Sequence, residues 1–174
     1  SARSCVPIGD DVDPVEAAVF GCAVLTGMGA VVNTGQVPPG ASALVVGLGG
    51  VGLSALLGAR ASGANPLIAV DVHQNKLDLA LSLGATHVVN ARDPDAVATI
   101  RELTRGGVDF AFEFAGSVPA MELAYGATRR GGTTITAGLP HPQDRWPLQQ
   151  VSLTTEERTV KGSYIGSCIP ARDV

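Results

Sequence analysis

The chain has 174 residues, of which 45% are hydrophobic, 16% are charged and 22 are glycine. This length and composition are typical of a compact α/β domain and exclude an intrinsically disordered chain. Twelve basic and 16 acidic side chains give a net charge of −4 without a basic run, which argues against nucleic acid and anionic membranes as partners.

The N-terminal sequence shows neither a secretion signal nor a membrane span. Residues 1–4 lead into no apolar core segment, and no stretch approaches the ~20 uninterrupted apolar residues that a span needs. The three cysteines, Cys5, Cys22 and Cys168, are odd in number and scattered, which favours free thiols in a reducing cytoplasm. The absence of an initiator Met is consistent with a piece of a longer protein.

The first 40 residues do not follow the pattern of the rest. In chain order we expect a short strand over Cys5–Ile8, a turn over Gly9–Asp13, a helix from Val15 behind Pro14, a second helix over about Thr26–Asn33 and a turn at Val37–Gly40.

From Ala43 onward, strand and helix patterns alternate. The expected strands are Ala43–Val46, Leu67–Val70, His87–Val89, Val108–Phe112, Thr133–Ala137 and Thr159–Ile165. The expected helices are Val51–Ser62, Asn75–Leu83, Ala96–Thr104 and Pro119–Ala127, and His141–Thr155 reads as a long surface connection. The alternation predicts an α/β fold with a doubly wound parallel (Rossmann) sheet of about six strands. Its right-handed crossovers bring the carboxyl ends of the strands to one edge.

A glycine-rich motif, Gly47-Leu48-Gly49-Gly50-Val51-Gly52, follows the first strand of this alternation and opens its first helix. A G-x-G-x-x-G pattern alone is a weak signal, but here a strand precedes it and a helix follows it. Gly47 permits a sharp turn, Gly49 permits close approach of a pyrophosphate, and Gly52 permits close helix packing. The N–H groups of the helix that starts near Val51 would then meet the phosphates. A glycine-rich turn without a ligand is the less favoured alternative.

An acidic residue completes this dinucleotide fingerprint. Asp71 lies nineteen residues beyond Gly52, at the end of the second strand. We expect its carboxylate to accept hydrogen bonds from the adenosine ribose hydroxyls. A 2′-phosphate at that place would face a like charge, which favours NAD over NADP.

Two further glycines, Gly116 and Gly138, each follow a predicted strand at the same edge. Each could be a plain turn glycine or part of a cofactor wall. Glu113 is harder to interpret, because it lies inside an otherwise apolar strand and a buried carboxylate needs polar partners.

Five segments, in order along most of the chain, resemble the zinc-dependent medium-chain alcohol dehydrogenases. They are Gly21–Gly27, Gly47–Gly52, Val70–Lys76, Phe112–Gly116 and Lys161–Gly166. The resemblance implies that Thr26 and Val51 touch the nicotinamide ring and that Lys76 reaches the adenosine ribose beside Asp71. It implies a wall for nicotinamide and its ribose, made mostly by backbone groups of Ala115, Gly116, Ala137, Leu139 and Ile165, next to Gly138.

The resemblance also implies that Cys22 is one thiolate ligand of a catalytic zinc, although by its residue type alone Cys22 would be a buried thiol. The family's other zinc ligands belong to an N-terminal catalytic domain that this chain lacks. We therefore expect residues 1–23 to be the remnant of that domain, 24–166 the NAD-binding Rossmann domain and 167–174 the start of the return to the catalytic domain. We expect no metal in this chain by itself and name no catalytic residue in it.

The function so predicted is the NAD-binding domain of an enzyme that oxidises an alcohol reversibly to an aldehyde or ketone by hydride transfer to NAD. Zinc would act as a Lewis acid in the complete enzyme, and this chain alone would be inactive. We expect a cytoplasmic homodimer that pairs through Thr159–Ile165. The alternatives are a zinc-free medium-chain quinone or enoyl reductase, which Cys22 and Asp71 argue against, a nucleotide-sensing module without chemistry, and a methyltransferase.

Overall fold

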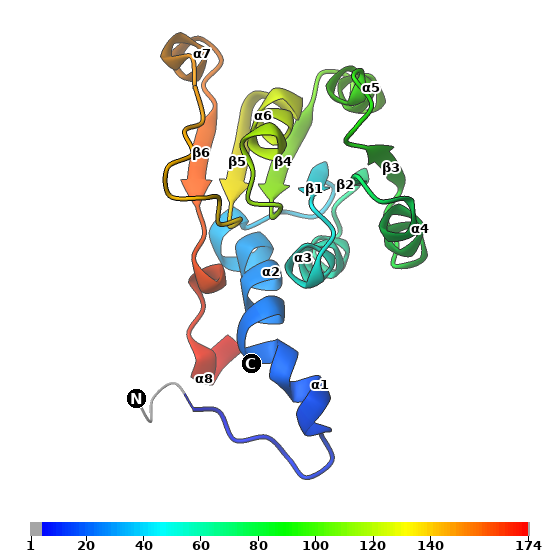
Figure 1. Cartoon of the computed structure of the whole chain (residues 1–174), viewed down its shortest axis with the longest axis vertical. Helices are drawn as coiled ribbons and strands as arrows, with labels where there is room; N and C mark the ends of the chain where they lie inside the picture. The colour runs from blue at the N-terminus through cyan, green and yellow to red at the C-terminus, as the bar shows by residue number, and fades with distance from the viewer. Residues whose placement is uncertain (1–4, 174) are drawn as a thin grey trace.

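The computed structural model describes residues 5–173 and contains one six-stranded, all-parallel sheet with the order β3-β2-β1-β4-β5-β6 (Figure 1). Its strands are β1 Ala43–Val46, β2 Leu67–Asp71, β3 His87–Asn90, β4 Val108–Glu113, β5 Thr128–Thr136 and β6 Thr159–Gly162. The order reverses between β1 and β4, as in a doubly wound sheet. The predicted fold class is therefore confirmed.

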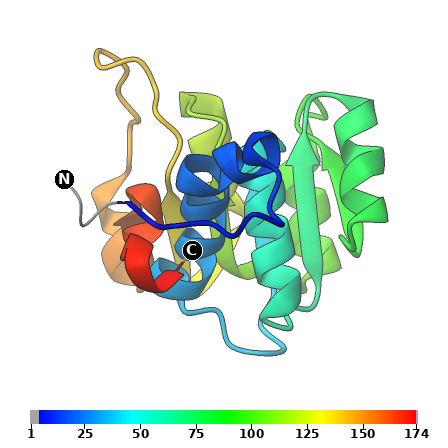
Figure 2. The ribbon, with the colours of Figure 1, turned by 90° about the horizontal axis from the view of Figure 1, so that it is seen from below.

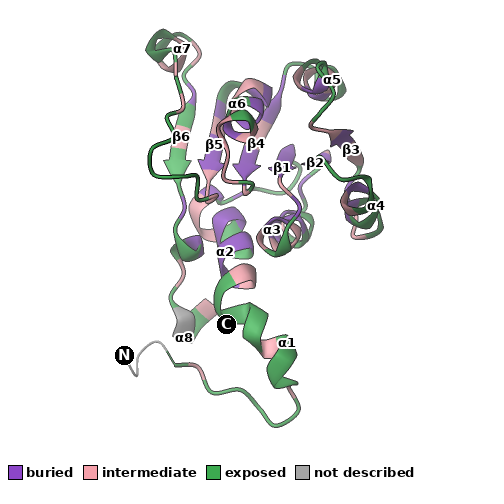
Figure 3. Ribbon diagram, in the orientation of Figure 1, coloured by how far each residue is buried: buried purple, intermediate pink, exposed green. Residues whose placement is uncertain are grey.

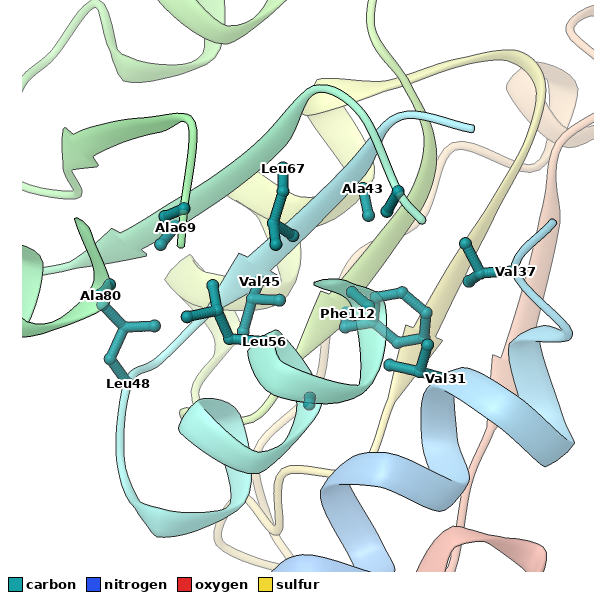
Figure 4. Close-up of a cluster of buried hydrophobic side chains, with 14 of the residues drawn as sticks. Val31, Val37, Ala43, Val45, Leu48, Leu56, Leu67, Ala69, Ala80 and Phe112 are labelled. Atoms are coloured by element: carbon teal, nitrogen blue, oxygen red, sulfur yellow. The ribbon is translucent and has the colours of Figure 1, made fainter. Parts of the chain in front are cut away.

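Helices cover both faces of the sheet. The four crossover helices are α3 Gly50–Ala61, α4 Gln74–Ser82, α5 Ala96–Leu103 and α6 Val118–Ala127, within two residues of their predicted bounds. The side chains of β1 alternate between two cores, because Val45 packs with α3 and α4 whereas Leu44 packs with α5 and α6. Figure 4 shows the first core, in which Phe112 and Leu56 lie beside Val45. Burial on both faces explains why β1 is apolar throughout.

The N-terminal segment forms one continuous helix over residues 14–35 where two helices were predicted. It consists of α1 Pro14–Val19, the π-helical η2 Phe20–Val24, α2 Leu25–Gly29 and the π-helical η3 Ala30–Gly35. The Asp13 carboxylate caps it by accepting a hydrogen bond from the Val15 N–H at 2.7 Å. The strand predicted over Cys5–Ile8 is wrong, since this segment pairs with no other strand of the described residues.

Only the second half of this helix is packed into the molecule. Figure 3 shows α1 mostly exposed and α2 largely buried beside α3. By length and composition alone, this helix of 22 residues could cross a membrane. Of its most apolar 18-residue stretch, 28% is buried inside the protein. A mostly buried core helix of a soluble protein and a signal sequence near the N-terminus meet the same test.

Glycines bring α2 and α3 close together. A Cβ atom on Gly27 would lie 2.2 Å from the Val51 carbonyl oxygen, and one on Gly58 would lie 3.3 Å from the Met28 Cα. Ala55 and Ala59 of α3 face the sheet and have no exposed area. Gly58 faces α2 instead.

The C-terminal region departs most from prediction. The strand expected to reach Ile165 ends at Gly162, since a turn follows in which Ile165, Gly166 and Ser167 have φ of 48°, 61° and 50°. This turn is the short 3₁₀ helix η4 Ile165–Ser167, and α8 Pro170–Asp173 follows it. Figure 2 shows η4 and α8 beside the helix of residues 14–35. The connection predicted over His141–Thr155 contains the helix α7 Gln150–Thr155.

Candidate functional site

The glycine-rich loop turns directly from β1 into α3. Gly47 has φ of +90°, a conformation that glycine adopts without strain, and a Cβ atom there would lie 2.7 Å from the Ala115 N atom. A Cβ atom on Gly52 would lie 1.8 Å from the Gly47 carbonyl oxygen. The first turn of α3 thus rests on the loop itself, so the close packing predicted for Gly52 is present.

Gly49 differs from these two glycines because its missing side chain faces open space. Its φ and ψ are −78° and −173°, which any residue can adopt, and a Cβ atom added to it would meet no other atom within 4 Å. Beside it, Gly50 and Val51 belong to the first turn of a twelve-residue helix, where backbone N–H groups have no partner within the helix. These amides and the helix dipole can bind a diphosphate.

The side chain of Leu48 is buried in the core, so only its backbone belongs to the loop surface. That backbone N–H donates a hydrogen bond to Asp71 Oδ2 at 2.8 Å, and the His73 N–H donates to Asp71 Oδ1 at 3.0 Å. Lys76 Nζ lies 3.6 Å from Asp71 Oδ2. Asp71 therefore ties the end of β2 to the glycine-rich loop, a structural role that sequence reasoning missed because Leu48 is distant along the chain.

The charge state of Asp71 follows from these contacts. Burial raises the pKa of this carboxyl, but the hydrogen bonds from Leu48 and His73 and the charge of Lys76 outweigh it, so that the pKa lies below its ordinary value. Asp71 is thus an anion at neutral pH, and its carboxylate can accept further hydrogen bonds from hydroxyl groups.

Next to Asp71 lies a cavity of about 180 Å³. Its walls are mainly apolar and come from the ends of β1 and β2, from the turn after β4 and from α6; they include Val46, Val72, Ala115 and Leu123. Apolar walls with one carboxylate at the side suit a flat, weakly polar base attached to a sugar.

On the other side of the loop, the turns after β4 and β5 touch through their glycines. A Cβ atom on Gly138 would lie 2.4 Å from the Gly116 N atom, and Gly116 has φ of +67°. Close backbone contact thus explains both glycines as turn residues. Ala115 is exposed and Ala137 half-buried at this edge, while the Leu139 side chain is 83% exposed.

Three predicted nicotinamide contacts come from elements that meet below this edge. Thr26 is buried on α2, Val51 is half-buried on α3, and Ile165 is 42% exposed on η4. Figure 1 shows α2 between α3 and η4, and α2 packs against both. A Cβ atom on Gly29 would lie 2.4 Å from the Gly166 carbonyl oxygen, so η4 is held closely on α2.

The predicted zinc ligand Cys22 is exposed on η2, which contradicts the buried thiol that its residue type alone suggests. Within residues 5–173, no group of three His, Cys, Asp or Glu side chains could hold a metal ion. A catalytic zinc needs about three protein ligands, so this part of the chain does not form such a site by itself.

Comparison with known proteins connects this geometry to one family. Residues 50–173 match the family model described as zinc-binding dehydrogenase. Alcohol dehydrogenase 1 of Trifolium repens is 36% identical over 170 residues, which cover 96% of this chain and 44% of the relative. The crystal structure of benzyl alcohol dehydrogenase from Acinetobacter calcoaceticus superposes with a TM-score of 0.92 at 38% identity, covering 96% of this chain and 46% of that one.

A protein from Sinorhizobium meliloti 1021 described as a zinc-binding dehydrogenase, in a structure bound to NADP, superposes with a TM-score of 0.88 at 27% identity. The match covers 95% of this chain and 49% of that one. The chain thus spans less than half the length of each of these relatives.

Proposed function

The chain belongs to the zinc-binding dehydrogenase family, and we propose that it is the NAD-binding part of an alcohol dehydrogenase that converts an alcohol reversibly to an aldehyde or ketone. One observation carries the proposal. The open face of Gly49, with free N–H groups of α3 beside it, lies next to the anionic Asp71 at one edge of the sheet. This arrangement offers donors to a diphosphate and acceptors to a sugar.

Different parts of the cofactor bind to different residues. The first turn of α3 holds the pyrophosphate, Asp71 and Lys76 hold the adenosine ribose, and the adjoining cavity takes the adenine. Because β2 and β4 flank β1, the nicotinamide half extends over the turns after β4 and β5, toward α2 and η4. When bound there, NAD would supply the hydride acceptor, and these residues would orient its nicotinamide ring toward the alcohol carbon.

The same geometry favours NAD over NADP. A 2′-phosphate would lie against the Asp71 carboxylate, whose low pKa keeps it charged at neutral pH. Lys76 is already 3.6 Å from that carboxylate and offsets only part of its charge. Because one relative with this fold is bound to NADP, the fold alone does not exclude a 2′-phosphate, and the preference proposed here rests on Asp71.

The remaining chemistry belongs to the whole protein. We propose that residues 1–23 belong to a catalytic part, that 24–166 form the NAD domain and that 167–174 lead back to the catalytic part. Exposed Cys22 would be one zinc ligand there, and exposed Val15, Val19 and Phe20 would contact that part. Since the described residues offer no second or third ligand beside Cys22, we derive no step through zinc and propose that this chain alone is inactive.

We further propose a cytoplasmic homodimer that pairs through the edge strand β6. This strand has β5 as its neighbour on one side, and Thr159, Lys161 and Gly162 are exposed. A zinc-free quinone or enoyl reductase is less favoured, because the accessible thiol of Cys22 and the acid at position 71 fit a zinc- and NAD-dependent enzyme better.

Titration calorimetry with NAD tests the proposal. Gly49→Val fills the space that the diphosphate needs without touching the protein, so we expect NAD affinity to fall at least about tenfold, or 1.4 kcal/mol, with stability retained. Gly21→Val is the matched control. A Cβ atom added at Gly21 also meets no atom within 4 Å, but Gly21 lies on η2 and not in the glycine-rich loop. Asp71→Ala should weaken NAD binding, and NADP should bind more weakly than NAD. Unchanged NAD binding in both the Gly49 and Asp71 variants would contradict the proposal.

A further inference from the structure

Glu113, the last residue of β4, is the feature that the proposed function leaves unexplained. Its side chain is 2% exposed and lies in the middle of the sheet, with β1 on one side and β5 on the other. Among the described residues, no Lys, Arg or His lies within ion-pair distance of it. A carboxylate buried without a cation is costly unless hydrogen bonds satisfy both of its oxygens.

Both carboxylate oxygens accept a hydrogen bond, one from the turn after β4 and the other from the end of β5. The Gly116 N–H donates to Glu113 Oε1 at 2.6 Å, and the Thr136 hydroxyl donates to Glu113 Oε2 at 2.8 Å. The backbone carbonyl of Glu113 accepts from the N–H groups of Ala137 and Gly138 at 3.0 Å and 3.1 Å. One residue thus binds the turn after β4 and the turn after β5 together.

On the side of Gly138, these bonds leave no room for a side chain. A Cβ atom on Gly138 would lie 2.7 Å from Glu113 Oε2 and 2.4 Å from the Gly116 N atom. The carboxylate is therefore packed between the two turns, and their relative position depends on it. A side chain without acceptor oxygens would leave the Gly116 N–H and the Thr136 hydroxyl without their partners.

The position of these turns relates them to one half of the cofactor. Asp71 ends β2, on one side of the glycine-rich loop, and Glu113 ends β4, on the other. With the adenosine on the β2 side and the diphosphate at the loop, the nicotinamide half must pass over β4 and β5. Gly116 and Gly138, which Glu113 holds, lie at that end of the sheet.

We propose that Glu113 is a positioning residue that fixes the two turns against which the nicotinamide half of NAD binds. The inference rests on the proposed function and deepens it. Glu113 acts through the backbone of Gly116 and Gly138 and through Thr136. A change at Glu113 should therefore affect binding of the nicotinamide half and leave the adenosine half unaffected, because other contacts hold Asp71 and line the cavity beside it.

Calorimetric titration with two ligands tests this. NAD carries both halves of the cofactor, whereas ADP carries only the adenosine and the diphosphate. We expect Glu113→Ala to weaken NAD binding about tenfold, because the two turns lose the hydrogen bonds that hold them in place, and to change ADP affinity less than about twofold. Glu113→Gln keeps an acceptor for Gly116 and a polar contact to Thr136, so it should restore most of the NAD affinity.

Two further variants complete the design. Thr136→Val removes only the hydroxyl, so it should keep the fold and weaken NAD about threefold without affecting ADP. Asp109→Asn is the matched control at the opposite end of β4, where the carboxylate accepts hydrogen bonds from Ser42 and Arg129. It should lower stability and leave the ratio of NAD to ADP affinity unchanged.

The outcomes separate the two proposals. A wild-type protein that binds neither ligand overturns the proposed function and, with it, the role of Glu113. Wild-type binding of both ligands, combined with equal losses of NAD and ADP affinity in the Glu113 and Thr136 variants, overturns the role of Glu113 alone. Unchanged NAD affinity in Thr136→Val and Glu113→Ala does the same.

Discussion

At the scale of single residues, two buried carboxylates organise the edge of the sheet. Asp71 accepts hydrogen bonds from the Leu48 and His73 N–H groups, and Glu113 accepts from the Gly116 N–H and the Thr136 hydroxyl. In both cases an acid holds in place a turn to which we propose that the cofactor binds. The donors offset the cost of burying each carboxylate.

The depressed pKa of Asp71 predicts a specific dependence of stability on pH. Because this pKa is lower in the folded than in the unfolded protein, Asp71 contributes stability that is fully present above the unfolded value of ~3.9 and is lost as pH falls through the folded value. Asp71→Asn keeps an oxygen for the Leu48 N–H but cannot titrate. We therefore expect the free energy of unfolding, measured with urea, to fall more steeply below about pH 4 in the wild type than in Asp71→Asn.

The difference between the two proteins isolates Asp71 from the other acids, since Asp109, whose pKa is also lowered, is present in both. Parallel curves from pH 7 to pH 3 would show that the Asp71 carboxylate has the same pKa in the folded and unfolded states.

At the scale of elements, the helix over residues 14–35 and η4 are joined by several contacts that the sequence does not reveal. Asn33 Nδ2 donates to the Gly166 carbonyl oxygen at 3.1 Å, and the Thr34 hydroxyl lies 2.9 Å from that of Ser163. Ile165 has φ of 48°, which is unfavourable for a β-branched residue. These contacts keep the turn in its strained conformation and so place Ile165 beside α2.

Removing the Asn33 side chain should release this turn. Asn33→Ala loses the hydrogen bond to Gly166, so we expect a loss of about 1 kcal/mol in the free energy of unfolding and faster amide hydrogen exchange at residues 165–168. The control is Asn75→Ala, since Asn75 is exposed on α4, far along the chain from η4. Exchange rates that change equally in both variants would mean that Asn33 does not hold the turn.

The elements that sequence predicted well are those with a local signal. The four crossover helices and the strands β1 to β4 follow from hydrophobic runs bounded by glycine and proline, within two residues. Gly27 and Gly29 lie inside the helix predicted over Thr26–Asn33, but the sequence did not reveal why these positions are glycine: the close approach of α3 and of Gly166 leaves no room for a Cβ atom. The left-handed turn at Ile165 likewise depends on Gly29 and Asn33, which are distant in sequence.

In the candidate site, too, the sequence revealed local patterns but not the contacts between residues that are distant along the chain. The motif Gly47–Gly52 and the acid at position 71 could be read from their spacing, because both are defined within one β-α-β unit. The bond from Leu48 to Asp71 and the bonds from Gly116 and Thr136 to Glu113 depend on which strands are neighbours in the sheet. Pattern alone therefore identified Glu113 as unusual without giving its partners.

At the scale of the whole molecule, the sheet has two edges that differ in their surroundings. At one edge, β3 packs against α4 and α5, whereas at the other β6 is largely exposed and leads into the turn at η4. An open strand edge tends to pair with another strand. The proposed homodimer places the β6 strands of two copies together.

The direction of the backbone groups in β6 makes this proposal testable. The Ser163 N–H donates to the Thr136 carbonyl of β5, and alternate residues of a strand point the same way, so the Lys161 N–H faces β5 and the Val160 N–H faces the open side. Val160→Pro therefore removes a donor from the open edge only, and Lys161→Pro removes one from the sheet. Light scattering at tens of micromolar should give twice the chain mass for the wild type and the single-chain mass for a folded Val160→Pro.

Lys161→Pro, the matched control, should instead lose stability, because its missing N–H belongs to the β5–β6 pairing. A monomeric wild type would contradict the dimer, and a dimeric Val160→Pro would place its interface away from β6.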